Sequence, residues 1–318
     1  MADEYRFPFQ LLDDIDFFIH NEGSNETDGE SGISLSELNR LCYPPINGEG
    51  DEYIGDVDPD VFLVNSLGLL VPDCKYYFPD TPEYILSPSH AKGFSVIHLN
   101  ICSIPRNLDT FIDQCISPLR WRFDAIGFCE TRLNNDIEHL YDIPLYTKFC
   151  NNHSRNSGGL ALYLLDTYDG NVRLDLMYQE ESIESLFVEI GCDFVVGVVY
   201  GRPNKNPGEF LEKFHDILER LKVERRKCYI MGDINLDLLK WETNIAVSDL
   251  VATCHSKLFF NSITKPTRVT DTSATLIDHI WSNDTLNNTS NGIVFTRISD
   301  HFPVFAIYKC DGIKVDDR

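Results

Sequence analysis

From Gly93 to Lys309 the sequence consists of short apolar runs, most of four to seven residues, and several of them end on a polar or charged residue. Runs of this length are too short for most helices and are typical of buried β-strands. We predict strands at residues 94–99, 123–129, 159–164, 185–190, 194–199, 228–231, 276–281 and 303–308. Several of these strands follow one another with no helix between them. The pattern therefore favours two sheets packed face to face over an alternating βαβ arrangement.

Helices are expected in three places. Residues 207–223 carry an apolar stripe at helical spacing, formed by Phe210, Leu211, Phe214, Ile217, Leu218 and Leu221. A second helix is predicted at residues 108–119, ending near Pro118, and a short third helix at residues 248–258. These helices are expected to cover the outer faces of the sheets.

Charge divides the chain near residue 93. Residues 1–92 hold 19 acidic and 4 basic residues, a net charge of −15, whereas residues 93–318 hold 31 and 23, a net charge of −8. We therefore predict an acidic and largely irregular segment at 1–92, a folded domain at 93–310 and a tail at 311–318. The acidic segment is either a partner-binding disordered tail or a solvated segment with a strand or two docked on the domain, and the second interpretation is favoured. The sequence of this segment does not identify a protein partner.

Cysteine usage and the N-terminus indicate an intracellular protein. None of the ten cysteines forms a C-x-x-C pair, and most fall in apolar runs, which is typical of buried free thiols in a reducing compartment. The N-terminus lacks the basic and apolar regions of a secretory signal. No run reaches the roughly 18 apolar residues of a membrane helix. We expect a protein of the nucleus or cytoplasm, with no membrane partner and no broad basic surface for nucleic acid.

The polar residues at the strand ends suit phosphodiester hydrolysis. They are Asn100, Glu130, Tyr200, Asp233, Asn235, Asp278, Asp300 and His301. Hard cations such as Mg²⁺ prefer carboxylate and amide oxygens, and Glu130 is the first expected ligand. His301 or Asp233 could activate the attacking water, and Asp278 could fix the tautomer of His301.

The remaining polar groups would position substrate. Asn100 and Asn235 would hold phosphate or water without adding charge, and Tyr200 and Arg202 would bind phosphate oxygens. Structural interpretations stay open for single residues, because Asp233, Asn235 and His301 could each belong to a turn. His98 and His279, which lie within strands, are interpreted as structural, and Trp121, Trp241 and Trp281 as core residues.

Seven segments resemble, in order, the motifs of the endonuclease/exonuclease/phosphatase family. More narrowly, they resemble the endonuclease domain of non-LTR (LINE-type) retrotransposons, which is similar to apurinic/apyrimidinic endonucleases. The segments are 98–101 (HLNI), 129–133 (CETRL), 157–163 (SGGLALY), 199–200 (VY), 232–235 (GDIN), 276–280 (LIDHI) and 299–301 (SDH). The resemblance covers roughly residues 93–309 and implies a four-layer α/β sandwich of two mixed β-sheets flanked by helices.

The resemblance also implies roles. Glu130 would bind Mg²⁺, or Mn²⁺ in its place, with Asn100 beside it, and Asp300 would lie near a second metal position. Asp233 would activate or orient water with help from Asn235, Asp278 would pair with His301 at the scissile phosphate, and Tyr200 would support phosphate or leaving group. One departure is Cys102, where the repair enzymes have an Asp two residues after the Asn. Target specificity is expected in the loop around residues 283–296.

Three functions follow as hypotheses. The first is a Mg²⁺-dependent endonuclease that nicks one strand of DNA. The resemblance leaves open whether a reverse transcriptase domain follows in the parent open reading frame. The second is a phosphatase or RNase with the same catalytic residues. The third is a catalytically silent retrotransposon remnant that acts as a binding module. The intact set of catalytic residues favours the first two, and the motif wording favours the first.

Overall fold

The computed structural model describes residues 74–79, 93–118, 122–152, 158–270 and 272–309. Residues 52–268 and 275–318 form one compact unit, and residues 1–51 with 269–274 form a second. The described part of the second unit belongs to a hairpin of β12 (Arg268–Thr270) and β13 (Ser273–Thr275), in which the Thr270 and Ser273 hydroxyls are hydrogen-bonded (2.8 Å). The predicted segment 1–92, apart from residues 74–79, lies outside the described residues, as do the tail 311–318 and Trp121.

The first large sheet has seven strands in the order β1-β15-β16-β2-β3-β5-β4. The strands are β1 (Lys75–Tyr77), β2 (Gly93–Asn100), β3 (Ala125–Cys129), β4 (Tyr146–Asn151), β5 (Leu160–Leu165), β15 (Asn288–Val294) and β16 (Val304–Lys309). At its centre β2 and β3 run parallel. They are connected through α4 (Ile104–Phe111), which continues into a π-helical turn (Ile112–Ile116).

Side-chain alternation along β2 explains how this sheet is covered. Ile97 and Leu99 belong to the same buried cluster as Leu108 and Phe111 of the helical segment, so this face of the sheet packs against α4. Phe94 points to the opposite face, where its ring stacks on Tyr229 of the second sheet with 5.1 Å between the ring centroids. The strand is therefore buried on both faces, as expected for a central strand of a sandwich.

The second large sheet has the order β11-β14-β10-β9-β8-β6, with β7 also paired to β8. The strands are β6 (Gly170–Val172), β7 (Tyr178–Gln179), β8 (Ile183–Ile190), β9 (Phe194–Gly201), β10 (Lys227–Asp233), β11 (Phe260–Asn261) and β14 (Asp278–Ser282). Here β9 and β10 form the parallel pair, and α5 (Pro207–Glu224) connects them. Each sheet thus contains a central pair of parallel strands connected by a helical crossover.

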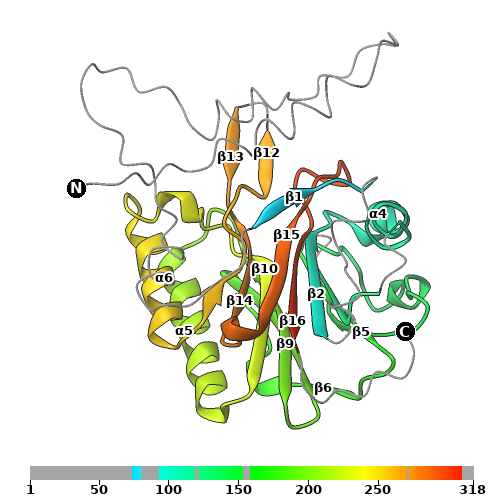
Figure 1. The fold of residues 1–318 in the computed structure, drawn as a ribbon, viewed down its shortest axis with the longest axis horizontal. Coiled ribbons are helices and arrows are strands. Elements are labelled where there is room, and N and C mark those ends of the chain that lie inside the picture. The colour runs from blue at the N-terminus through cyan, green and yellow to red at the C-terminus, as the bar shows by residue number, and fades with distance from the viewer. Residues whose placement is uncertain (1–73, 80–92, 119–121, 153–157, 271, 310–318) are drawn as a thin grey trace. The chain divides into compact units, whose positions relative to one another are not determined.

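The larger unit is a four-layer sandwich, as the sequence and the resemblance predict. The sheets pack face to face through β2 against β10 and β3 against β9. Figure 1 shows α5 and α6 (Ile245–Ser256) side by side beyond one sheet and α4 beyond the other. The Asn206 and Asn244 side chains cap the N-termini of α5 and α6 by accepting backbone N–H groups. Short 3₁₀ turns occupy Glu138–Leu140, Leu174–Leu176, Leu238–Lys240 and Thr285–Asn287.

The structure corrects several predicted elements. The specificity loop expected around residues 283–296 contains β15, which is largely buried and paired with both β1 and β16, so half of this segment is part of the sheet. The helix predicted at 108–119 begins at Ile104, where Pro105 occupies its first turn. Strands β4, β6, β7, β11, β12 and β13 were not predicted. Strand β1 lies in the segment predicted as 1–92 and pairs with β15.

Candidate active site

The two parallel strand pairs bring their carboxyl ends to one edge of the sandwich. Asn100 is the last residue of β2 and Asp233 the last of β10, Glu130 directly follows β3, and Tyr200 lies next to the end of β9. In the sheet register Asp233 is opposite both Tyr200 and Asp278. Carboxyl ends of parallel strands are where open α/β sheets present binding and catalytic groups.

The amide of Asn100 joins two carboxylates from different sheets. Its Nδ2 donates to Glu130 Oε1 (3.1 Å) and to Asp233 Oδ2 (2.8 Å), while its Oδ1 accepts from the backbone N–H of Cys102 (3.2 Å). The N–H of Cys102 fixes the orientation of the amide, because only an oxygen can accept it. The Tyr200 hydroxyl donates to the same Glu130 oxygen (2.8 Å). Glu130, Asp233, Asn100 and Tyr200 therefore form one contiguous network.

Several residues of this network and its flanks adopt left-handed backbone conformations. Cys102 (φ 56), Glu130 (φ 51), Arg132 (φ 54) and Asn235 (φ 54) all have positive φ without being glycine. Such conformations are unfavourable by about 1–3 kcal/mol each and persist where the surroundings enforce them, often at functional sites. Two hydrogen bonds hold Asn235 in this conformation: its Nδ2 donates to Gly201 O (2.8 Å), and its N–H donates to Asp233 Oδ1 (3.0 Å).

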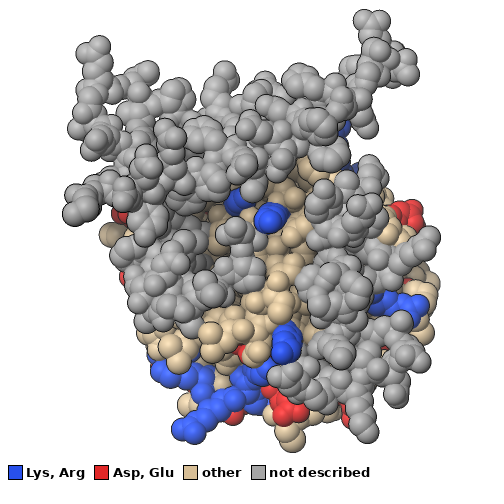
Figure 2. Space-filling view, viewed as in Figure 1, with Lys and Arg blue, Asp and Glu red and all other residues tan. Residues whose placement is uncertain are grey.

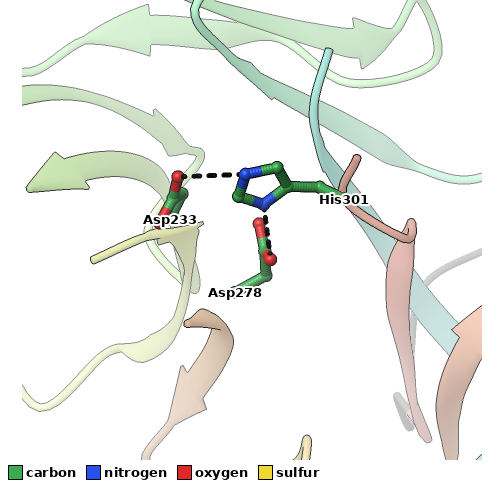
Figure 3. Close-up of side chains that lie close together, drawn as sticks. All are labelled: Asp233, Asp278 and His301. Atoms are coloured by element: carbon green, nitrogen blue, oxygen red, sulfur yellow. Dashed lines mark hydrogen bonds and ion pairs between the residues drawn. The ribbon is translucent and has the colours of Figure 1, made fainter. Parts of the chain in front are cut away.

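His301 lies between two carboxylates, as Figure 3 shows. Its Nδ1 donates to Asp278 Oδ2 (2.9 Å), and its Nε2 is 3.9 Å from Asp233 Oδ2. All three side chains are nearly inaccessible to solvent. The Thr267 hydroxyl also donates to Asp278 Oδ2 (2.7 Å), and His98 Nε2 lies 3.6 Å from Asp278 Oδ1. Asp278 is thus held in place from both sides.

Burial and charge move the pKa values of this group apart. Burial raises the pKa of Asp233 to about 7, against the opposing charge of His301. Burial alone would raise the pKa of Asp278, but the charge and hydrogen bond of His301 outweigh it and hold that pKa well below its usual value. Burial alone would lower the pKa of His301, but the neighbouring Asp278 carboxylate outweighs it and raises the pKa to about 9. His301 is therefore an imidazolium at neutral pH.

Two residues predicted from the sequence are held at the margin of the network. The Arg202 guanidinium is paired with the buried Glu184 carboxylate, which also accepts the backbone N–H of Gly159 (2.7 Å). The Asp300 carboxylate accepts from Arg268 Nε (2.8 Å) and lies 2.7 Å from Arg268 Nη2. Arg202, which follows β9, is therefore linked to Gly159 through Glu184. Asp300 is held by Arg268.

Sequence reasoning missed three groups that contact the acidic residues. Thr267 and His98 touch Asp278, and Arg268 binds Asp300. Thr267 and Arg268 belong to no predicted strand, and no motif singles them out. His98 stands two residues before Asn100, so side-chain alternation along a strand could have placed it on the same face.

Two sets of side chains could hold a divalent cation. Asp233, Asp278 and His301 offer ligand atoms within 4.8 Å of one another. However, Asp278 Oδ2 and His301 Nδ1 are hydrogen-bonded to each other, and Thr267 occupies the same oxygen. Glu130 and Asp233, by contrast, direct carboxylate oxygens at one Asn100 amide nitrogen. The all-oxygen pair fits a hard cation such as Mg²⁺ better than the set containing an imidazole.

Charge on the visible surface is local. Figure 2 shows Lys and Arg in small separate groups on this face, the larger of them beside Asp and Glu at the lower edge. Some of the basic side chains in the described part of the chain are held in ion pairs, such as Arg226–Glu189 (2.9 Å) and Arg173–Glu224 (2.7 Å).

The eight described cysteines are free thiols. Within the described residues every helix is too short or too polar to cross a bilayer.

Comparison with family models finds a sequence match over part of the chain. Residues 194–305 match the family model described as endonuclease-reverse transcriptase. The match runs from β9 into β16 and includes Tyr200, Asp233, Asp278, Asp300 and His301. Comparison with curated proteins finds no match.

Solved nucleases share the fold at low sequence identity. The endonuclease domain of TRAS1, a telomere-specific non-LTR retrotransposon, is 14% identical, with a TM-score of 0.53 over 69% of this chain and 99% of that chain. An AP endonuclease from Archaeoglobus fulgidus is 13% identical, with a TM-score of 0.53 over 68% and 100%. The 3′-5′ exonuclease NExo from Neisseria meningitidis is 13% identical, with a TM-score of 0.52 over 68% and 100%. The resemblance to the endonuclease/exonuclease/phosphatase family is therefore confirmed, in sequence over residues 194–305 and in fold over about two thirds of the chain.

Proposed function

We propose that this protein is a Mg²⁺-dependent phosphodiester hydrolase that nicks one strand of DNA. The observation that carries the proposal is the convergence of Asn100, Glu130 and Asp233 at one edge of the sandwich, with His301 3.9 Å from Asp233. Carboxylates, an imidazolium and a tyrosine hydroxyl in one network supply the groups that phosphodiester hydrolysis requires.

Glu130 and Asp233 would hold the cation, with Mn²⁺ as an alternative to Mg²⁺, and Asn100, whose Nδ2 donates to both carboxylates, would position these ligands. A bound divalent ion supplies a Lewis acid that polarises the phosphoryl oxygen and stabilises the leaving oxygen. The Tyr200 hydroxyl donates to Glu130 Oε1 at 2.8 Å and so fixes the orientation of this carboxylate. Tyr200 then contributes by positioning Glu130, because its single hydroxyl proton is donated to that carboxylate.

Asp233 is the residue we assign to the attacking water. It lies 3.9 Å from His301 Nε2 and would accept the proton that water loses as its oxygen bonds to phosphorus. His301, whose pKa is near 9, keeps its proton at neutral pH and donates to the scissile phosphate. Asp278 maintains that charge through Nδ1, and Asn235 holds the Asp233 carboxylate through its backbone N–H.

We propose DNA as the substrate because the proteins that resemble this chain are described as endonucleases. The family model describes an endonuclease joined to a reverse transcriptase, and the TRAS1 domain is a retrotransposon endonuclease. We accordingly propose a retrotransposon-type enzyme, found in the nucleus or cytoplasm, whose open reading frame continues into a reverse transcriptase. The alternatives are a phosphatase or RNase that uses the same side chains, and a silent remnant that only binds.

The test is nicking of supercoiled plasmid. The wild type should convert it to the open circular form with Mg²⁺, and EDTA should stop the reaction. Asp233→Ala should reduce the rate by roughly a thousandfold, because it removes both the base and a metal ligand. Asp216→Ala removes an exposed carboxylate from α5 and should leave the rate unchanged. No nicking by the wild type, or equal nicking by wild type and Asp233→Ala, would contradict the proposal.

A substrate panel separates the alternatives. Plasmid, abasic DNA, RNA and inositol phosphates should be offered under the same conditions. Preference for RNA or inositol phosphate would favour the second function. Binding of DNA without hydrolysis of any substrate, together with no calorimetric signal for Mg²⁺, would favour the silent remnant.

A further inference from the structure

An arginine neutralises the acidic residue that precedes His301. Arg268 donates from Nε to Asp300 Oδ2 at 2.8 Å, and its Nη2 lies 2.7 Å from the same oxygen. Both side chains reach the surface, with 40% of Arg268 and 43% of Asp300 exposed. The guanidinium is therefore anchored at one end while much of it stays open to solvent.

The backbone places this ion pair directly beside the catalytic histidine. Arg268 and His301 form an isolated antiparallel bridge, and Phe302 N–H donates to Thr267 O (2.7 Å). Two consecutive residues therefore bind the two acids next to His301. Thr267 donates to Asp278, which is hydrogen-bonded to His301, and Arg268 donates to Asp300, which precedes His301 in the chain. Arg268 is thus positioned by the same segment that supports the Asp278–His301 pair.

The second oxygen of Asp300 is also engaged. The Cys102 thiol donates to Asp300 Oδ1 with an S···O distance of 3.6 Å. Both oxygens of Asp300 therefore have protein donors, and the local positive charge belongs to Arg268.

A phosphodiester strand at this site meets several acidic groups. Glu130 and Asp233 bind Asn100, Asp278 binds His301, and Asp300 precedes His301 in the chain. The chain as a whole carries a formal net charge of −23. Binding a polyanion there requires fixed cations, and an arginine fork is the side chain best matched to phosphate oxygens.

We propose that Arg268 is a substrate-binding residue whose guanidinium, held by Asp300, binds a phosphate of the DNA strand next to the scissile bond. In this arrangement Asp300 is a positioning residue for Arg268, and Arg268 supplies the positive charge that a second metal ion at Asp300 would supply. The inference rests on the proposed nuclease function and adds a residue to its substrate site.

DNA binding without metal gives the first test. A short fluorescein-labelled DNA duplex is titrated in EDTA at several salt concentrations, and its anisotropy is measured. Arg268→Ala should weaken binding by roughly tenfold. It should also reduce the slope of log K against log salt by about 0.9, the value for one lost phosphate contact on B-DNA. Arg268→Lys should keep the slope, because the charge remains. Arg220→Ala, which removes an exposed cation from α5, should change neither value.

Metal affinity gives the second test. Calorimetric titration with Mn²⁺ should give the same affinity for Asp300→Asn as for the wild type, because Asp300 binds Arg268. Glu130→Gln should lose Mn²⁺ affinity and serves as the positive control. Thermal unfolding of each variant checks that it is folded.

The outcomes separate this inference from the proposed function. A wild type that binds and nicks DNA, with Arg268→Ala unchanged in affinity and salt slope, overturns the inference alone. Loss of Mn²⁺ affinity in Asp300→Asn comparable to that in Glu130→Gln also overturns it. A wild type that neither binds nor cleaves DNA overturns the proposed function and this inference with it.

Discussion

At the scale of single residues, the Asn100 amide links the two sheets at the site. Its Nδ2 donates to both Glu130 and Asp233, and its orientation is fixed by the N–H of Cys102, which donates to its Oδ1. The residues at the strand ends could be predicted from sequence, because a polar residue after a buried apolar run needs a partner. Thr267 and Arg268 could not, since only the folded chain brings them to Asp278 and Asp300.

Removal of the Asn100 amide should destabilise the metal-free protein. In Asn100→Ala the buried Asp233 carboxylate loses a hydrogen-bond donor, so the free energy of unfolding should fall by about 1–3 kcal/mol. Denaturant unfolding in EDTA measures this loss. Asn171→Ala, at an exposed position of β6, should change stability by less than about 0.5 kcal/mol. Equal stability of the two variants would show that the amide does not support the carboxylates.

His301 should titrate well above an ordinary histidine in the metal-free protein. NMR of its ring signals should give a pKa near 9, because Asp278 favours the imidazolium. Asp278→Asn should lower this pKa by about 1–3 units, whereas Asp216→Asn should leave it unchanged.

The same shift affects stability. The pKa of His301 is higher in the folded chain than the ordinary histidine value of 6.5. Its contribution to stability is therefore fully present below about pH 6.5 and is lost as pH rises through about 9. Asp278→Asn should flatten that part of the stability profile. A His301 that titrates near 6.5 in the wild type would contradict the account.

At the scale of elements, the site depends on how closely β9 and β10 approach. Gly232 precedes Asp233, and a Cβ at this position would collide with the backbone oxygen of Val199. The motif glycine is thus a requirement of strand packing, and it places Asp233 at the end of β10.

Gly232→Ala should accordingly separate these strands. We expect a loss of at least about 2 kcal/mol in the free energy of unfolding, together with loss of nicking, as Asp233 moves. Gly208→Ala is the matched change, because Gly208 lies in the first turn of α5 and is exposed. It should be tolerated or stabilising by about 0.5 kcal/mol. Guanidinium midpoints measure both. A tolerated Gly232→Ala would rule out the packing explanation.

Strand prediction succeeded for buried apolar runs and failed where strands carry polar residues. The central strands β2, β3, β9 and β10 are mainly apolar segments. Strand β15 contains Asn288, Ser290 and Asn291, so its composition resembles a loop. One of these polar groups has a partner inside the fold, because Asn288 Nδ2 donates to Ser262 Oγ (2.8 Å). Tertiary context therefore overrides local propensity here.

At the scale of the whole molecule, two half-sites from separate sheets make one centre. Each sheet contributes a parallel pair and a helical crossover, and each pair ends in one carboxylate, Glu130 or Asp233. Neither sheet holds the complete set. Because the chain is acidic, the proposed DNA binding would rely on local cations such as Arg268 and on bound metal, and it should weaken with salt.

Paramagnetic broadening by Mn²⁺ tests this convergence most directly. Mn²⁺ added below one equivalent should broaden the ring signals of His301, which lies 3.9 Å from Asp233, while the signals of His215 on α5 stay sharp. Glu130→Gln should abolish the selective broadening, although Glu130 comes from the other sheet. Equal broadening of both histidines, or His301 broadening that persists in Glu130→Gln, would contradict a single metal site shared by the two sheets.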